Sequence, residues 1–239
     1  MRAFRGGLQH RPLRGLGQGT SPASFGGGVP PAVAALSAIT TSTDTGTATT
    51  YAPTGVSLGA ADWTRQVICA IMSRTSSGTS AGAGIASASI GGVAATVHIA
   101  DSSNANGCSA AIISAYVPQG ATGTISVTFN GAQIWFYCAV YRAVTLLSAA
   151  AFHTASANGA TPQALSLNTP ANGIAIACSS WTDSATAVTT AGVTEDGDAA
   201  FDSDRIGYGS VSGLGAQTGR AISFDVTADT GAAVAASWQ

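Results

Sequence analysis

The chain has 239 residues, of which 46% are hydrophobic and only 8% are charged. Disordered chains combine low hydrophobicity with high net charge, so this composition excludes them and predicts a packed core. The formal net charge is −2 and no residue is a lysine. The missing amine excludes a Walker A phosphate loop and Schiff-base catalysis.

Residues 1–43 predict a basic arm and linker ahead of a folded body. They contain four arginines and no acid, whereas residues 44–239 contain five arginines and eleven acids. Frequent Gly, Pro, Ser and Thr indicate an extended segment, and the glycines interrupt the apolar stretch that a secretory signal needs. No run approaches the ~18 apolar residues of a membrane span. We expect partner contacts from Arg2, Arg5, Arg11 and Arg14.

Residues 44–239 predict one all-β body. Short segments rich in β-branched and aromatic residues alternate with clusters of Gly, Pro, Asn and Ser. No long segment combines the apolar spacing of a helix with helix caps. Ten or more strands at spacings of roughly 8–12 residues indicate an antiparallel, jelly-roll-like β-sandwich. We find no exact internal repeat.

Residues 78–82 match G-x-S-x-G, the nucleophile elbow of α/β-hydrolases, with Ser80 at the serine position. The motif positions a catalytic serine only on a sharp turn between a strand and a helix. Here the sequence that follows predicts a strand, and His98 lies in an ordinary strand pattern. We therefore interpret the match as a loop and predict no enzymatic activity.

Residues 122–141 predict two strands joined by a hairpin. Residues 122–130 alternate apolar and polar side chains, which indicates a half-buried strand, and Asn130-Gly131 favours a type I′ turn. Residues 132–141 are apolar on both faces, so a second layer or another subunit must cover the outer face. We assign the exposed face to the interface of a homo-oligomer, such as a trimer, through Trp135, Tyr137 and Tyr141.

The four cysteines are too dispersed for a small disulfide scaffold. Three of them lie in apolar runs, where a free thiol behaves as a small buried hydrophobe. This pattern favours free thiols and leaves disulfides open for Cys69, Cys108, Cys138 and Cys178.

Residues 194–205 form the densest acidic segment. Carboxylates on a glycine-containing loop offer the oxygen ligands that calcium prefers, but their spacing does not match an EF-hand loop. Paired carboxylates also suit a glycosidase, but nothing near them marks a sugar cleft. We predict no cofactor or metal, and the calcium alternative rests on Glu195, Asp196, Asp198, Asp202 and Asp204.

Three stretches together resemble a β-sandwich module of tailed-bacteriophage structural proteins. They are GVSLGAADWTRQVICAIMSR, SASIGGVAATVHIA, and AAIISAYVPQGATGTISVTFNG leading into IWFYCAVYR. The shared features are a Leu-Gly step before an Arg-containing strand, an Ile-Gly-Gly step, and a Val-Pro-x-Gly turn before an alternating strand. The resemblance covers roughly residues 54–145 and contains no catalytic motif.

This resemblance implies a non-enzymatic virion component, either a capsid decoration protein or part of a head, neck or tail fibre. Its partners would be other virion proteins and further copies of itself. The arm would then pair its arginines with carboxylates of a neighbouring subunit.

Two alternative functions remain open. Loops at one end of the sandwich offer a host-glycan site, with contacts from Trp63, Trp181 and Tyr208. The arm also offers phosphate contacts to nucleic acid, but four arginines make a small footprint and the acidic body opposes such binding.

Overall fold

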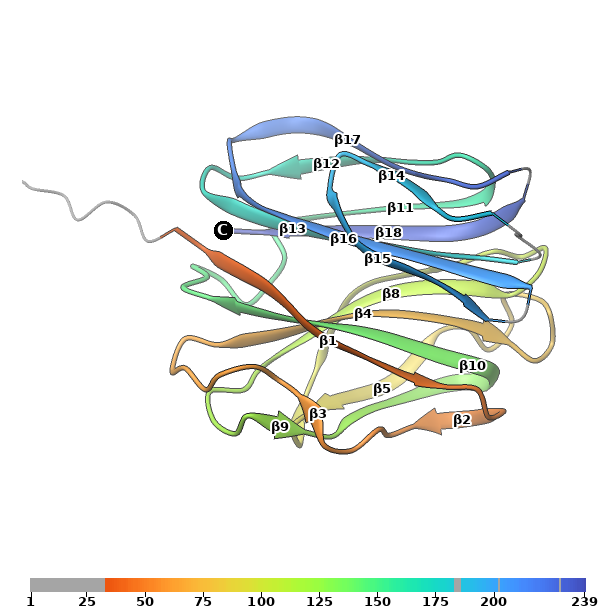
Figure 1. Ribbon diagram of the computed structural model, residues 1–239, viewed down its shortest axis with the longest axis horizontal. Coiled ribbons are helices and arrows are strands. Elements are labelled where there is room, and N and C mark those ends of the chain that lie inside the picture. The colour runs from red at the N-terminus through yellow and green to blue at the C-terminus, as the bar shows by residue number, and fades with distance from the viewer. Residues whose placement is uncertain (1–32, 183–185, 202, 228) are drawn as a thin grey trace, which may run out of the picture. The chain divides into compact units, whose positions relative to one another are not determined.

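The structure is a computed structural model that describes residues 33–182, 186–201, 203–227 and 229–239. Over these residues the chain forms 18 strands and no helix, which confirms the predicted antiparallel, jelly-roll-like β fold (Figure 1). The arm residues Arg2, Arg5, Arg11 and Arg14 lie outside the described residues. In the described part of the chain, no helix is long and apolar enough to cross a membrane.

The first half of the described chain folds into two antiparallel layers that share one strand. Its strands are β1 (Ala35–Asp44), β2 (Ala48–Tyr51), β3 (Val56–Ser57), β4 (Gln66–Thr75), β5 (Ile85–Ile90), β6 (Val93–Ala94), β7 (Thr96–Ser102), β8 (Cys108–Tyr116), β9 (Thr122–Gly123) and β10 (Ile125–Val144). One layer has the order β1-β10-β4-β8-β7, and the other has the order β2-β10-β5-β6. Strands β3 and β9 form a separate short ladder.

Strand β10 runs without a break through the segment where the sequence predicted a hairpin. Residues 125–129 pair with β5 and residues 135–143 pair with β4, so β10 passes from one layer to the other. Asn130 and Gly131 lack the positive φ angles of a type I′ turn. A Cβ on Gly131 would lie 2.9 Å from the Cα of Gly82, so this glycine instead allows the loop before β5 to approach closely.

Strand β1 lies in the segment that the sequence assigned to the linker. It pairs along its length with β10, from Ala35 opposite Val144 to Asp44 opposite Phe136. The strand forms a sheet edge and is mostly exposed, so it lacks the apolar alternation that marks a half-buried strand. The described residues 33–43, which the sequence assigned to the linker, therefore belong to the compact body.

The second half of the chain forms two further antiparallel sheets. A five-stranded sheet has the order β11-β18-β13-β16-β15, and a three-stranded sheet has the order β12-β17-β14. The strands are β11 (His153–Ala160), β12 (Gln163–Thr169), β13 (Gly173–Trp181), β14 (Thr189–Ala191), β15 (Thr194–Phe201), β16 (Asp204–Leu214), β17 (Gln217–Asp225) and β18 (Thr230–Trp238).

The two halves have the same topology. In chain order, β1, β2, β4, β5, β7 and β8 take the places of β11, β12, β13, β14, β15 and β16. The two ends of β10 take the places of β17 and β18. We call residues 35–144 the first repeat and residues 153–238 the second. The two repeats share their strand order and not their sequence. Strand order depends only on where strands and turns lie along the chain, so it needs no matching residues.

The two repeats stack face to face, and each also has its own core. Strand β4 is buried on both faces: alternate residues belong to the first repeat's core and to the core between the repeats. Strand β13 does the same in the second repeat. This double burial explains why QVICAIMSR and GIAIACSSW read as continuous apolar runs.

The stacking of the two repeats is asymmetric, although their topology is the same. Strand β4 faces its counterpart β13, β8 faces β18, and β10 faces β15 and β16. On one rim β7 contacts β11, and Asn158 Nδ2 donates a 2.8 Å hydrogen bond to Asp101 Oδ1. On the opposite rim a groove lies beside β1, β10 and β15.

Candidate binding surfaces

The second repeat covers the apolar face of β10 that the sequence assigned to an oligomer interface. Trp135, Tyr137 and Tyr141 are each no more than 5% exposed. Trp135 stacks on Phe201 with ring centroids 5.0 Å apart, and the hydroxyls of Tyr137 and Tyr208 are 3.1 Å apart. The covering layer lies within the chain, which corrects the assignment of these three side chains to contacts between subunits.

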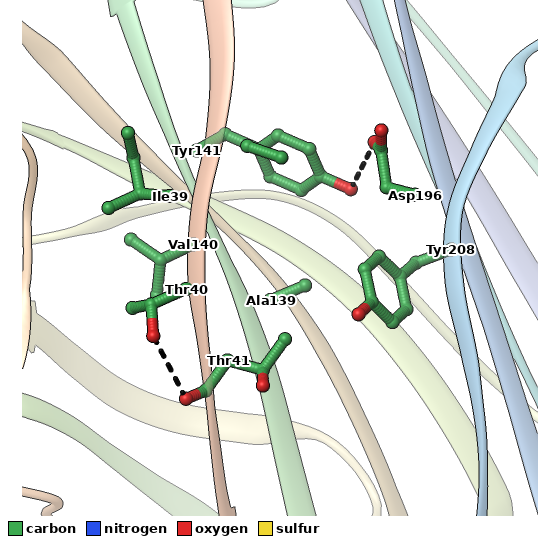
Figure 2. A pocket seen from close by; sticks show the side chains of 9 residues that line it. Ile39, Thr40, Thr41, Ala139, Val140, Tyr141, Asp196 and Tyr208 are labelled. Carbon is green, nitrogen blue, oxygen red and sulfur yellow. Dashed lines mark hydrogen bonds between the residues drawn. The ribbon is translucent and has the colours of Figure 1, made fainter.

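A groove of about 310 Å³ opens between the repeats (Figure 2). Residues 38–41 of β1 and 139–141 of β10 line one side, and Asp196 and Tyr208 come from the second repeat. Tyr141 donates a 3.0 Å hydrogen bond to Asp196 Oδ2. Burial, together with the neighbouring Asp196 carboxylate, raises the pKa of Tyr141, so the phenol stays protonated and donates the bond. We call this site the inter-repeat groove.

The acids proposed for calcium are dispersed. Asp198 lies 3.6 Å from Arg205, and Asp204 accepts bonds from Arg74 and Trp135. Glu195 and Asp196 are exposed on β15, and Asp202 lies outside the described residues. The described residues contain no cluster of three or more acidic, histidine or cysteine side chains able to hold a metal ion.

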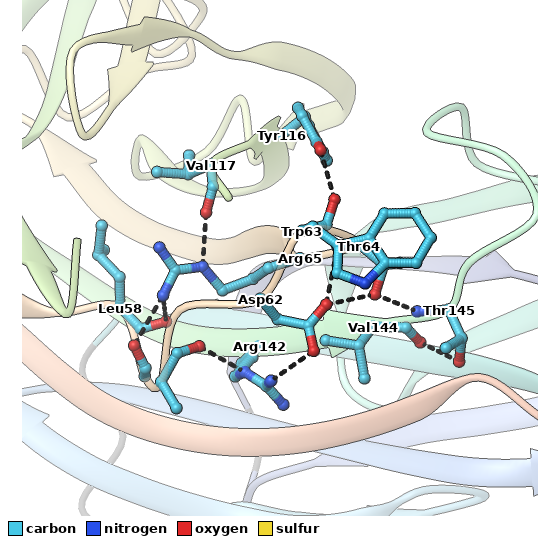
Figure 3. A network of polar contacts seen from close by, with 12 residues as sticks. Leu58, Asp62, Trp63, Thr64, Arg65, Tyr116, Val117, Arg142, Val144 and Thr145 are labelled. Atoms are coloured by element: carbon cyan, nitrogen blue, oxygen red, sulfur yellow. Dashed lines mark hydrogen bonds and ion pairs between the residues drawn. The ribbon is translucent and has the colours of Figure 1, made fainter. Parts of the chain in front are cut away.

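Trp63 is the most prominent exposed aromatic side chain of the described chain, with 80% of its surface accessible (Figure 3). Hydrogen bonds hold the backbone of the Trp63 loop at Trp63 itself and at the next residue, Thr64. The Asp62 carboxylate accepts 2.7 Å bonds from both the backbone N–H and the hydroxyl of Thr64, and the Tyr116 hydroxyl donates to the carbonyl of Trp63. The bonds from Thr64 lower the pKa of Asp62 and keep its carboxylate ionised.

Hydrogen bonds from Arg65 hold the Trp63 loop against the turn that follows β8. The Arg65 side chain is fully buried, and its guanidinium donates hydrogen bonds to five backbone carbonyls. Two acceptors lie in the loop before Trp63 and three lie in the turn after β8, so one cation ties two loops together. The acceptors are Leu58, Gly59, Val117, Gln119 and Gly120.

Further exposed apolar side chains lie at the same end of the first repeat. Thr145 donates from its N–H to the Thr64 hydroxyl at 3.2 Å and from its own hydroxyl to the Val33 carbonyl at 2.8 Å. These bonds connect the Trp63 loop to the first described residue of the chain. We define the Trp63 surface by three exposed side chains that these bonds connect: Val33, Trp63 and Tyr116.

The other two aromatic residues proposed for glycan contact are not exposed. Trp181 is fully buried in the second repeat and donates to the Ser179 hydroxyl at 2.9 Å. Tyr208 lies between the repeats and is 8% exposed. Of the three proposed residues, only Trp63 is available to a large ligand.

Ser80 lies in a bend, and strand β5 follows it, as the sequence predicted. Its hydroxyl donates to the side chain of Asn104. His98 lies in β7 and contacts a different serine: its Nε2 is 2.6 Å from the hydroxyl of Ser114. Its Nδ1 accepts from the N–H of Ala151, which leaves the proton on Nε2. His98 is therefore a hydrogen-bond donor to Ser114 in this arrangement and not a base for it.

All four cysteines are buried and free, which confirms the pattern read from their apolar surroundings. Burial raises the pKa of Cys108, Cys138 and Cys178. Buried neutral thiols behave as small packing groups.

Two residues of this site, Arg65 and Tyr116, were not predicted from the sequence. The sequence places Arg65 next to the apolar residues 67–72, and a cation that is buried there needs several hydrogen-bond acceptors. Tyr116 gave no such signal, because its exposure depends on where β8 ends in the folded chain.

Comparisons with family models, with curated proteins and with solved structures gave no match.

Proposed function

We propose that the protein is a non-enzymatic structural component of a virion, either a capsid decoration protein or part of a head, neck or tail fibre. In this proposal its N-terminal arm and the Trp63 surface attach it within the particle, to other virion proteins and to further copies of itself. The observation that carries the proposal is an exposed tryptophan on a rigid loop, hydrogen-bonded through Thr145 to the residue where the described chain begins.

The rigidity of the loop supports a binding role. A large exposed aromatic side chain costs solvation free energy unless a partner covers it, and tryptophan is enriched among residues that dominate protein interfaces. A loop already held by Arg65, Asp62 and Tyr116 loses little further entropy when it binds. The Trp63 surface is therefore suited to a preformed contact.

The test is incorporation into particles. Trp63→Ala should lower the copy number per particle by about tenfold or more, as expected for a residue that dominates an interface. Val93→Ala, another exposed apolar residue, is the matched control and should have no effect. Normal incorporation of Trp63→Ala, with an unchanged melting temperature, would contradict the proposal.

A host glycan is the second candidate partner for the same surface. The Trp63 indole is exposed, the exposed Tyr116 bonds to the Trp63 carbonyl, and the polar side chains of Asp62 and Arg142 lie close to the loop (Figure 3). An apolar aromatic face next to hydrogen-bonding groups suits a sugar ring. Under this alternative, Trp63→Ala abolishes binding to immobilised host glycans and leaves the copy number per particle unchanged.

A further inference from the structure

Two sheet edges flank the inter-repeat groove. Among the described residues, β1 pairs only with β10 and β15 pairs only with β16. Each edge carries a shift in register, between Ala38 and Thr40 in β1 and between Glu195 and Gly197 in β15. An unpaired strand edge offers backbone N–H and C=O groups to an added strand.

The two rims of the stacked repeats differ although the topology of the repeats is the same. On one rim, β7 and β11 contact each other directly, with Asn158 bonded to Asp101. On the other rim, the space beside β1 and β15 holds the inter-repeat groove and a second hollow of about 250 Å³ next to Trp135. This rim therefore has room for an extended segment.

The open rim is acidic. Glu195 and Asp196 are exposed on β15, and Asp44 is exposed at the end of β1. Arg74 and Arg205 form ion pairs with other acids, Asp204 and Asp198. Arg142, which lies on β10 opposite Ser37 of β1, pairs with Asp62. An extended ligand with several cations and no acid is the kind that complements such a rim.

We propose that the inter-repeat groove receives the arginine-rich segment 1–32 of a second copy of this chain. The segment carries four arginines and no acid, and its guanidinium groups pair with the carboxylates of β15. Its 32 residues span roughly 100 Å when extended, far more than the length of the groove along β1. The inference rests on the proposed attachment through the arm and names its receptor.

The geometry where the chain enters β1 favours a second copy over the same chain. Ala34 is buried in the core, and Val33 accepts a hydrogen bond from Thr145 at the end of the sandwich. The groove lies further along β1, at residues 38–41. The segment of the same chain would have to turn back on itself to lie along β1 there, whereas the segment of a neighbouring copy needs no such reversal.

The absence of lysine makes a clean cross-linking experiment feasible. Arg11→Lys keeps the charge and introduces the chain's only side-chain amine. A carbodiimide then joins that amine to a carboxylate that it touches, with loss of water. Mixing isotopically labelled and unlabelled full-length copies distinguishes links between copies from links within one copy by mass spectrometry.

We expect links between copies from position 11 to Glu195, Asp196 or Asp44. Combining Arg11→Lys with Glu195→Gln and Asp196→Asn should reduce these links at least several-fold, and Asp196→Asn keeps an acceptor for Tyr141. Asp225→Asn, which changes an exposed acid on β17, is the control and should have no effect. Links confined to one copy, links to acids elsewhere, or no links would each overturn the inference.

The outcome is separable from that of the proposed function. If deletion of the arm abolishes incorporation into particles but no link to the groove forms, the arm binds a different virion protein and only the inference fails. If the links form in the free protein but the protein is absent from particles, the inference holds and the proposed function fails.

Discussion

The indole Nε1 of Trp135 donates a 2.6 Å hydrogen bond to Asp204, and this bond joins the first repeat to the second. The other oxygen of Asp204 accepts a 2.8 Å bond from Arg74, which also belongs to the first repeat. Asp204 is only 3% exposed. One carboxylate of the second repeat is therefore held by two side chains of the first, and its role is structural.

Asp204→Ala should destabilise the stacked repeats. It leaves the Trp135 N–H and the Arg74 guanidinium without this acceptor, at a cost of about 2–4 kcal/mol. Asp204→Asn, which keeps one acceptor oxygen, should cost less. Urea unfolding measures both variants, and Asp225→Ala on the exposed face of β17 is the control. Equal stability of the Asp204→Ala variant and the unmodified protein would show that the bridge contributes nothing.

Two deletions test where the body begins. Removal of residues 1–30 should leave cooperative unfolding with a melting temperature within about 2 °C of the full chain, because no described strand is lost. Removal of residues 1–43 takes away nearly all of β1, exposes the edge of β10, and should lower the melting temperature by roughly 10 °C or more. Calorimetry that finds the two deletions equally stable would restore the boundary at residue 44.

Arg65→Lys should destabilise the body and loosen the Trp63 loop. A lysine ammonium has three donors and cannot reach all five carbonyls that the planar guanidinium satisfies. Leaving buried carbonyls unpaired costs about 2–4 kcal/mol in total. Faster hydrogen exchange at residues 58–65 should accompany the lost stability. Arg220→Lys, at a partly exposed arginine of β17, is the matched control.

His98 should make stability depend on pH in mildly acidic solution. Burial lowers the pKa of His98 in the folded chain below its ordinary value of 6.5, and its Nδ1 accepts from Ala151. The unfolded chain therefore binds a proton first as the pH falls, so stability decreases below about pH 6.5 until the lower folded pKa is reached. His98→Gln should remove this part of the pH dependence.

Urea midpoints at pH 7.5 and pH 5.0, for the unmodified protein and for His98→Gln, measure the effect. Carboxylates such as Asp62, whose pKa is lowered in the fold, act mainly below this range. An unmodified protein whose stability is constant between these two pH values would refute the assignment.

The local properties of the chain were determined by the sequence alone. Alternation and turn residues predicted the all-β class, and the loop at Ser80 and the buried cysteines followed from their immediate neighbours. The two-sided apolar run of residues 132–141 correctly required cover on both faces. These properties depend on side-chain pattern within a few residues, which a sequence shows directly.

Tertiary structure decided what lies against each face. A pattern shows that Trp135 must be covered, but the covering layer is supplied by residues about 70 positions later, such as Phe201 and Asp204. For the same reason Trp63 and Trp181 look alike in sequence, yet one is exposed and the other buried. Strand β1 and the unbroken β10 also depend on distant partners, because edge pairing and close approach to Gly82 leave little trace in local composition.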